Sequence, residues 1–267
     1  MDSYAHELNR LKAIYKASAR SFQETILPNA RSTVLIRRAR SSLLNSVSPD
    51  DAAMVKTYIA LHIRRGDRRP SFYNGRYIPS EDFVQAAIDA WERLNPDISA
   101  ENLFLYVASD SARAYEEILR LTETRYTSLS LFQSEDPELR ALASPQDYVQ
   151  SEFDRLDEKA RILATRGVIV DFALVSGFWV EHEDDLVPTA TVCMLRYDCP
   201  LIQSLITLLI CSRYSSNICK LSALGLGWER GFGQVDAMGK VDDDHKRWVE
   251  VDQKGLVVPV WAPFELF

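Results

Sequence analysis

The stretch TYIALHI (57–63), followed at once by RRGDRRPSFYNGRY (64–77), decides the fold class of this 267-residue chain. The first part is apolar and β-branched, which predicts a buried strand. The second part is polar and rich in turn-forming residues, which predicts a loop. An apolar helical face then runs over residues 83–94, and Ser80 is its expected N-cap. A strand, a loop and a helix in this order form the first half of a βαβ unit.

The same alternation continues along the chain. NLFLYVAS (102–109) predicts a second buried strand, and Ser109 or Asp110 is placed to cap the helix that follows it. Further strands are expected at 126–132 and 189–195. Strands that alternate with helices of roughly 10–15 residues are typical of an α/β protein with a parallel sheet.

Three other segments are expected to be helical. Residues 1–50 carry apolar residues at helical spacing. GVIVDFALVSGFW (167–179) could form a strand or a helix, and its length and the spacing of Asp171 from Val168, Leu174 and Val175 favour a mostly buried helix. NICKLSALGLGW (217–228) predicts a helix that ends at Gly225 or Gly227.

Composition and charge exclude several classes of protein. Apolar residues make up 46% and charged residues 26% of the chain, which is typical of a globular domain and argues against bulk disorder. The net charge of −7 argues against a nucleic-acid-binding protein, which usually carries a basic face. No stretch approaches the roughly 18 apolar residues of a membrane span. The polar N-terminus does not resemble a signal peptide.

The cysteines and the acidic runs predict no metal site. The four cysteines, at positions 193, 199, 211 and 219, have no zinc-binding spacing and are expected to be buried thiols. The acidic runs beside His182 and His245 are expected to be solvated turns, because consecutive acids cannot all face one ion. The sequence also lacks a glycine-rich phosphate loop and a Ser-His-Asp pattern.

The end of the first strand is the most informative candidate site. Alternation along the strand sends His62 and Arg64 to one side and Arg65 to the other. Ligands of open α/β sheets bind at the carboxyl ends of strands, and the planar fork of an arginine suits a diphosphate. Gly66 would allow a close turn and Asp67 could orient an arginine. A solvated turn in which Asp67 pairs with Arg64 or Arg65 is the alternative.

Two more features suit a nucleotide. Ser215, Ser216 and Asn217 precede an apolar helical run, and free N–H groups at a helix start attract anions, although plain capping explains them too. Asp171 lies in an apolar run and needs partners. Its carboxylate could accept two hydrogen bonds from guanine, or it could belong to a structural salt bridge.

Taken in order, ALHIRRGD, FLYVASD, VDFALVSG and SSNICKLSALGLGW resemble one family. This is the superfamily of GDP-fucose-dependent fucosyltransferases, which includes the α-1,6-fucosyltransferases and the protein O-fucosyltransferases, and the likeness is strongest to its fungal members. The resemblance covers residues 57 to about 230. It implies a Rossmann-like parallel sheet with helices on both faces, as in the C-terminal half of a GT-B glycosyltransferase.

The resemblance also implies roles for individual residues. His62 would lie near the guanosine, Arg64 would bind the diphosphate as the catalytic residue, with Arg65 beside it, and Asp171 would recognise guanine. Ser215, Ser216 and Asn217 would hold phosphate at a helix start. The donor would be GDP-fucose and the acceptor a glycan or a protein, and fucose would be transferred with inversion without a required metal. The Golgi or the secretory lumen would be the compartment.

The chain departs from the family in three ways. Only about 60 residues precede the HIRRGD motif, so residues 1–50 are expected to be a helical remnant of the partner lobe and 51–267 the donor-binding domain. No acid that could act as the catalytic base follows Asp67 directly, and Glu81 and Asp82 are better explained as first-turn helix residues. Residues 194–214 are expected to be an insertion, either one specific to this lineage or a translated intron. The alternatives are therefore an inactive nucleotide-sugar-binding remnant, or an interaction domain that binds no nucleotide.

Overall fold

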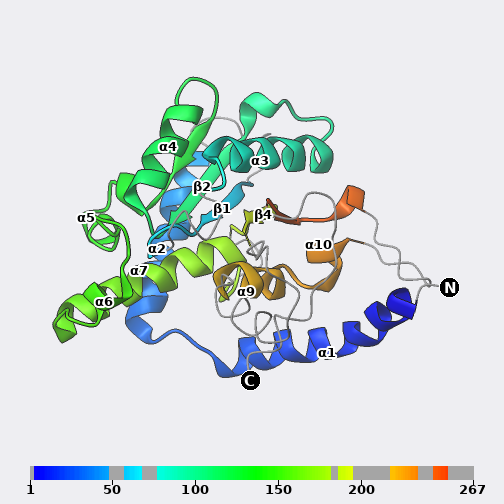
Figure 1. Cartoon of the computed structure of the whole chain (residues 1–267), viewed down its shortest axis with the longest axis horizontal. Coiled ribbons are helices and arrows are strands. Elements are labelled where there is room, and N and C mark those ends of the chain that lie inside the picture. The colour runs from blue at the N-terminus through cyan, green and yellow to red at the C-terminus, as the bar shows by residue number, and fades with distance from the viewer. Residues whose placement is uncertain are drawn as a thin grey trace.

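The computed structural model of the chain describes residues 3–47, 57–67, 77–181, 186–194, 217–233 and 243–251. A five-stranded parallel sheet in the order β3-β2-β1-β4-β5 forms its centre, and helices cover both faces (Figure 1). The strands are β1 Ile59–Ile63, β2 Phe104–Ser109, β3 Thr127–Leu129, β4 Ala190–Cys193 and β5 Trp248–Glu250. The expected α/β class, with a Rossmann-like parallel sheet, is confirmed.

The helices follow the predicted segments closely. They are α1 Ser3–Thr25, α2 Ala30–Val47, α3 Ser80–Leu94, α4 Ala112–Thr122, α5 Pro137–Arg140, α6 Gln150–Phe153, α7 Glu158–Ser176, α9 Asn217–Leu226 and α10 Trp228–Phe232. Short 3-10 helices span Ala100–Asn102, Leu131–Gln133 (η3) and Asp243–His245. None of the helices in the described part of the chain is long and apolar enough to cross a membrane.

The direction of winding reverses at β1. From this central strand the chain runs outward through β2 and β3 on one side, and later through β4 and β5 on the other. Because parallel crossovers are right-handed, the reversal places α3 and α4 on one face of the sheet and α7 and α9 on the opposite face. A crevice is expected at the carboxyl ends of the strands where the winding reverses.

Side-chain alternation along the strands builds two separate cores. The odd-numbered residues of β1 and β2 pack against α3 and α4, and the even-numbered ones pack against α2 and α7. Both sets are almost fully buried, which explains why the strands read as continuous apolar runs rather than as alternating ones. Helix α2 therefore shares a core with β1 and β2.

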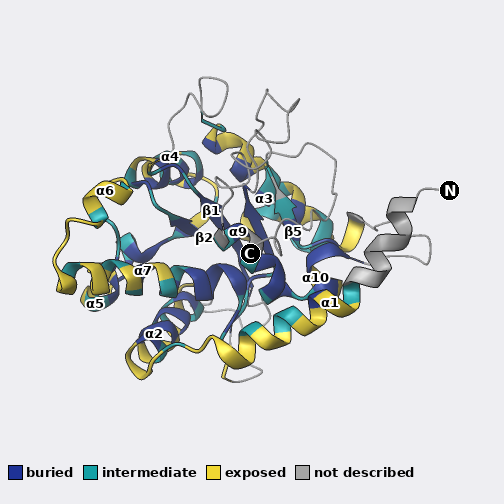
Figure 2. Cartoon of the chain, turned by 60° about the horizontal axis from the view of Figure 1, so that its bottom comes forward, coloured by how far each residue is buried: buried dark blue, intermediate teal, exposed yellow. Residues whose placement is uncertain are grey.

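Helix α7 shows how burial changes along one element. Its first half is largely exposed, and its buried residues all lie from Gly167 onward (Figure 2). Asp157 caps its N-terminus by accepting a hydrogen bond from the Ala160 N–H, and Gly177 ends it in the left-handed conformation with φ of 73°. The expected buried helix around Asp171 is confirmed, and it begins earlier than residue 167, with an exposed first half that starts after the Asp157 cap.

A third core joins α1, α9, α10 and β5. The ring of Tyr15 on α1 packs edge-on against Trp228 and Phe232 of α10, with centroids 5.4 and 5.3 Å apart. Trp248 of β5 donates a hydrogen bond from its indole N–H to the Cys219 carbonyl of α9 at 3.1 Å. The first helix is thereby anchored beside the last strand.

The structure corrects three local expectations. Pro79, not Ser80, precedes α3 as the N-cap residue, and the Ser80 hydroxyl instead donates to Glu117. Ser111, not Ser109 or Asp110, caps α4. The cysteines at 193 and 219 form a disulfide rather than remaining thiols. The Ser80 hydroxyl and Cys193 each find a partner far along the chain, Glu117 and Cys219. Ser111 takes the cap position of α4 in place of its neighbours Ser109 and Asp110.

The contact between α9 and α7 depends on a glycine. A Cβ atom at Gly225 would overlap the backbone carbonyl of Ser176, so Gly225→Ala must push the two helices apart. We expect this change to lower the free energy of unfolding by about 3 kcal/mol, measured by urea denaturation. Gly231→Ala is the matched control. Its Cβ would meet its nearest neighbour at 3.4 Å, so stability should stay equal or rise slightly. Equal stability of both variants would contradict the close packing.

Candidate functional site

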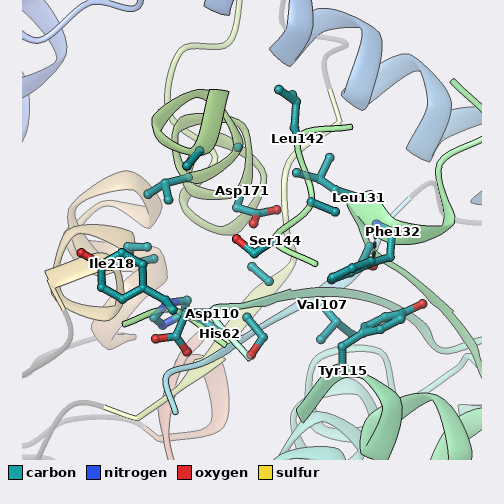
Figure 3. A pocket seen from close by; sticks show the side chains of 18 of the residues that line it. His62, Val107, Asp110, Tyr115, Leu131, Phe132, Leu142, Ser144, Asp171 and Ile218 are labelled. Atoms are coloured by element: carbon teal, nitrogen blue, oxygen red, sulfur yellow. Dashed lines mark hydrogen bonds between the residues drawn. The ribbon is translucent and has the colours of Figure 1, made fainter. Parts of the chain in front are cut away.

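A cavity of about 310 Å³ opens at the carboxyl ends of β1 and β2, bounded by α7 and by the chain after β3 (Figure 3). Its volume lies at the lower end of the range for small-molecule sites. Asp171 comes from α7, Ile218 from α9, and Tyr115 and Phe132 stack on each other with centroids 5.4 Å apart. The polar lining residues are His62, Arg64, Ser109, Asp110, Ser130, Ser144, Tyr148, Thr165 and Asp171.

The structure brings His62, Arg64 and Asp171 to this one cavity. His62 is the fourth residue of β1 and is almost fully buried between Ala108 of β2 and Cys193 of β4. Arg64 follows the strand on the same side, as alternation predicts. Asp171 reaches the cavity from α7, so it borders the space from a different element than His62 and Arg64 do.

Two carboxylates hold the guanidinium of Arg64. It lies 2.9 Å from Asp67 and 2.8 Å from Asp110, and its Cζ atom lies 5.1 Å from the ring centre of Tyr148. Asp67 thus orients Arg64, which is expected both for a diphosphate-binding loop and for a solvated turn in which Asp67 pairs with an arginine. The side chain of Arg64 is 27% exposed and lines the cavity.

Asp110 is a site residue that the sequence analysis treated only as a possible helix cap. It accepts a hydrogen bond from the Arg65 N–H at 2.7 Å and pairs with Arg64. Burial raises the pKa of the Asp110 carboxyl, and the charge of Arg64 opposes this shift. Its position directly after a buried strand was the available signal, because carboxyl ends of neighbouring parallel strands meet at one edge.

Arg65 is not brought to the cavity. Its side chain points to the other face of the sheet and is only 8% exposed. It donates to Glu117 at 2.5 Å and to the Ile78 carbonyl and the Ser80 hydroxyl at 2.9 Å each. Burial would raise the pKa of Glu117, but the hydrogen bonds from Arg65 and Ser80 outweigh it and lower the pKa. The expected donor-binding role of Arg65 is therefore replaced by a structural one.

Gly66 provides the close turn that its position suggested. A Cβ atom there would lie 2.6 Å from both the Asp110 carboxylate and the Tyr148 carbonyl. A larger residue would therefore separate the β1 loop from Asp110 and Tyr148. The glycine is needed for packing at the mouth of the cavity.

Asp171 has no salt bridge among the described residues and is not part of a structural ion pair. Its carboxylate accepts a hydrogen bond from the Tyr106 hydroxyl at 2.5 Å and borders the cavity. Burial raises the pKa of Asp171 to about 7, and the hydrogen bond from Tyr106 lowers it only in part. A carboxyl group that ionises near neutral pH inside a cavity is a functional-site signature.

The phosphate-binding helix start is described only in part. Ser215 and Ser216 lie outside the described residues, and Asn217 is the first residue of α9. Ile218, the next residue, lines the cavity, so α9 begins beside it. The Cys193–Cys219 disulfide links this first turn to the end of β4, with Cα atoms 5.7 Å apart. The disulfide thus joins the described residues on either side of 195–216, and all of the expected insertion at 194–214 except Met194 lies outside the described residues.

No group of three or more His, Cys, Asp or Glu side chains able to hold a metal ion occurs within the described ranges. The expected acidic turn at His182 lies outside them, whereas His245 ends a 3-10 helix. Comparison of the chain with protein-family models, with curated proteins and with solved structures finds no match.

Proposed function

We propose that the chain is the donor-binding part of a GDP-fucose-dependent fucosyltransferase, which transfers fucose to a glycan or protein acceptor with inversion. The observation that carries the proposal is the meeting of His62 and Arg64 with Asp171, which lies far from them in sequence, around one cavity beside the start of α9. The family resemblance picked the same three residues from sequence motifs alone.

In the proposed reaction, the acceptor oxygen attacks the anomeric carbon of fucose while the bond from that carbon to the β-phosphate oxygen breaks. Negative charge then develops on the departing GDP. Arg64 and the backbone N–H groups at the start of α9 would stabilise it. Asp171 would accept hydrogen bonds from the guanine N1–H and 2-amino groups. The acceptor proton passes to a base that we do not assign to a residue of this chain.

One observation bears on the affinity for the donor, which the inactive alternative, a domain that binds the nucleotide sugar without turning it over, also requires. Arg64 already pairs with Asp67 and Asp110, so a diphosphate must replace at least one of these carboxylates. The exchange weakens binding, because the displaced carboxylate loses its counter-charge in a partly buried place. Binding and turnover must therefore be measured separately.

Titration calorimetry with GDP, ADP and UDP tests the binding, and a turnover assay with GDP-fucose tests the transfer. We expect GDP to bind ahead of the other two nucleotides. Any hydrolysis or transfer should be slow, since no residue of this chain is assigned to position the acceptor, and it should survive EDTA. Absence of GDP binding would refute the proposal and favour an interaction domain. Binding without turnover would select the inactive alternative, and activity that EDTA abolishes would refute the metal-free mechanism.

A further inference from the structure

Arg64 and its two carboxylate partners form an ion-pair cluster at the end of β1. Asp67 pairs with Nη2 of the guanidinium at 2.9 Å, and Asp110 pairs with Nη1 at 2.8 Å. The two carboxylates therefore hold different nitrogen atoms of one cation. An anion that binds Arg64 competes with both of them, and the surroundings of each carboxylate decide which one it displaces.

Asp110 is fixed by the backbone around it. Its Oδ1 atom accepts a hydrogen bond from the Arg65 N–H at 2.7 Å, and its main-chain carbonyl accepts one from the Tyr148 N–H at 2.8 Å. Its side chain is only 13% exposed. A buried carboxylate that loses its counter-ion is strongly destabilising, because water cannot replace the lost cation. Asp110 is therefore expected to keep its contact with Arg64.

Asp67 lies in different surroundings. Its side chain is 33% exposed, and Arg64 is its one ion-pair partner among the described residues. Water can hydrate this carboxylate once it leaves the arginine, so the exchange costs little. Arg64 and Asp110 line the cavity, whereas Asp67 does not. Its departure from Arg64 therefore leaves the described wall of the cavity in place.

We propose that Asp67 is an internal competitor of the anionic ligand at Arg64. A phosphate group displaces the Asp67 carboxylate from Nη2, while Asp110 keeps its hold on Nη1 and so positions the guanidinium. Asp67 thereby lowers the affinity of the site for anions, and it keeps Arg64 paired when no anion is bound. The inference rests on the proposed function only in that Arg64 binds the diphosphate.

Titration calorimetry with the full chain tests it, with GDP and inorganic pyrophosphate as separate probes. Asp67→Asn should bind both probes about three- to tenfold more tightly than the parent, because the variant loses the competing ion pair and the repulsion between Asp67 and the incoming anion. Its Tm should stay close to that of the parent, since the lost ion pair is exposed.

Asp147→Asn is the matched control. Asp147 is exposed and precedes Tyr148, whose ring centre lies 5.1 Å from the Arg64 Cζ atom. The substitution removes the same charge from this neighbourhood and keeps both carboxylates that hold Arg64. Water and salt screen an exposed charge, so the affinity should change by less than about twofold.

Carboxyl ¹³C NMR of labelled aspartate shows directly which carboxylate leaves. The two signals are assigned from the spectra of Asp67→Asn and Asp110→Asn. When pyrophosphate is added to the parent protein, the Asp67 signal should move to the position of solvent-exposed aspartates, and the Asp110 signal should move less. An Asp110 signal that moves as far as that of Asp67, or farther, would overturn the inference.

The two probes distinguish failure of this inference from failure of the proposed function. GDP binding that is equal or weaker in Asp67→Asn, or an equal gain in Asp147→Asn, would overturn the inference alone. Pyrophosphate binding that tightens in Asp67→Asn, without any binding of GDP, would support the inference and refute the nucleotide. If neither probe binds to the parent or to Asp67→Asn, both are refuted.

Discussion

Arg64→Ala should bind GDP about ten- to hundredfold more weakly than the unmodified protein. The change removes a charge-assisted, forked contact with the diphosphate, worth roughly 1.5–3 kcal/mol. It also leaves Asp67 and Asp110 without their cation beside the cavity, and these carboxylates then repel an anion. Arg64→Lys should restore little of the affinity, because a lysine provides a point charge without the planar fork.

Arg65→Ala is the informative comparison for this experiment. The two arginines are neighbours in sequence, but Arg65 is buried and binds Glu117, Ser80 and the Ile78 carbonyl. Its loss should lower the free energy of unfolding by about 3 kcal/mol, because it leaves Glu117 without its main partner. Arg113→Ala, whose side chain is 79% exposed, controls for a general loss of charge and should change neither property. Calorimetry and urea denaturation provide the two readouts. If Arg64→Ala keeps full GDP affinity, the site assignment fails.

Asp171→Asn should make the protein more stable above pH 7 and less selective for guanine. The pKa of about 7 in the folded protein lies above the ordinary aspartate value, so ionisation of this buried carboxyl destabilises the folded state. The protonated carboxyl carries no such penalty at low pH, and the folded state loses stability as the pH rises from about 4 to about 7. One pKa unit corresponds to about 1.4 kcal/mol, so the gain in Asp171→Asn is at most about 4 kcal/mol.

The pH dependence isolates this carboxyl from the others. Asp110 and Glu117 also have shifted pKa values, but they are present in both proteins, so the difference in stability between variant and parent reports Asp171. We expect that difference to grow between pH 4 and pH 7 in urea denaturation and then to level off. A difference that does not change with pH would contradict the raised pKa.

Guanine selectivity provides the second half of the prediction for Asp171. Ionised Asp171 can accept from two guanine donors, whereas adenine presents an acceptor at the corresponding ring nitrogen. GDP affinity should therefore increase as the pH rises through about 7, and GDP should bind ahead of ADP. The Asp171→Asn change would replace one acceptor by a donor and erase much of this preference. A variant that is more stable but less selective would fit a residue kept for binding rather than for folding. Equal binding of GDP and ADP by the parent protein would contradict the guanine role.

Much of the fold could be predicted from sequence periodicity. The predicted strands at 57–63, 102–109 and 189–195 contain β1, β2 and β4, and the predicted helix at 217–228 contains α9. These segments are apolar because helices cover both faces of the sheet, so their signal is strong and local. β5 was missed because Trp248–Glu250 is short and follows a charged run, and its strand identity comes from pairing with β4.

The sequence by itself determined the α/β class and the side of β1 on which His62 and Arg64 lie, because backbone alternation and apolar periodicity are local properties. Only the tertiary structure decided the partners of the polar groups. It paired Arg64 with Asp110, Arg65 with Glu117, Asp171 with Tyr106 and Cys193 with Cys219. Each of these outcomes depends on a residue many positions away, which the fold places within hydrogen-bonding or bonding distance and which no local pattern encodes.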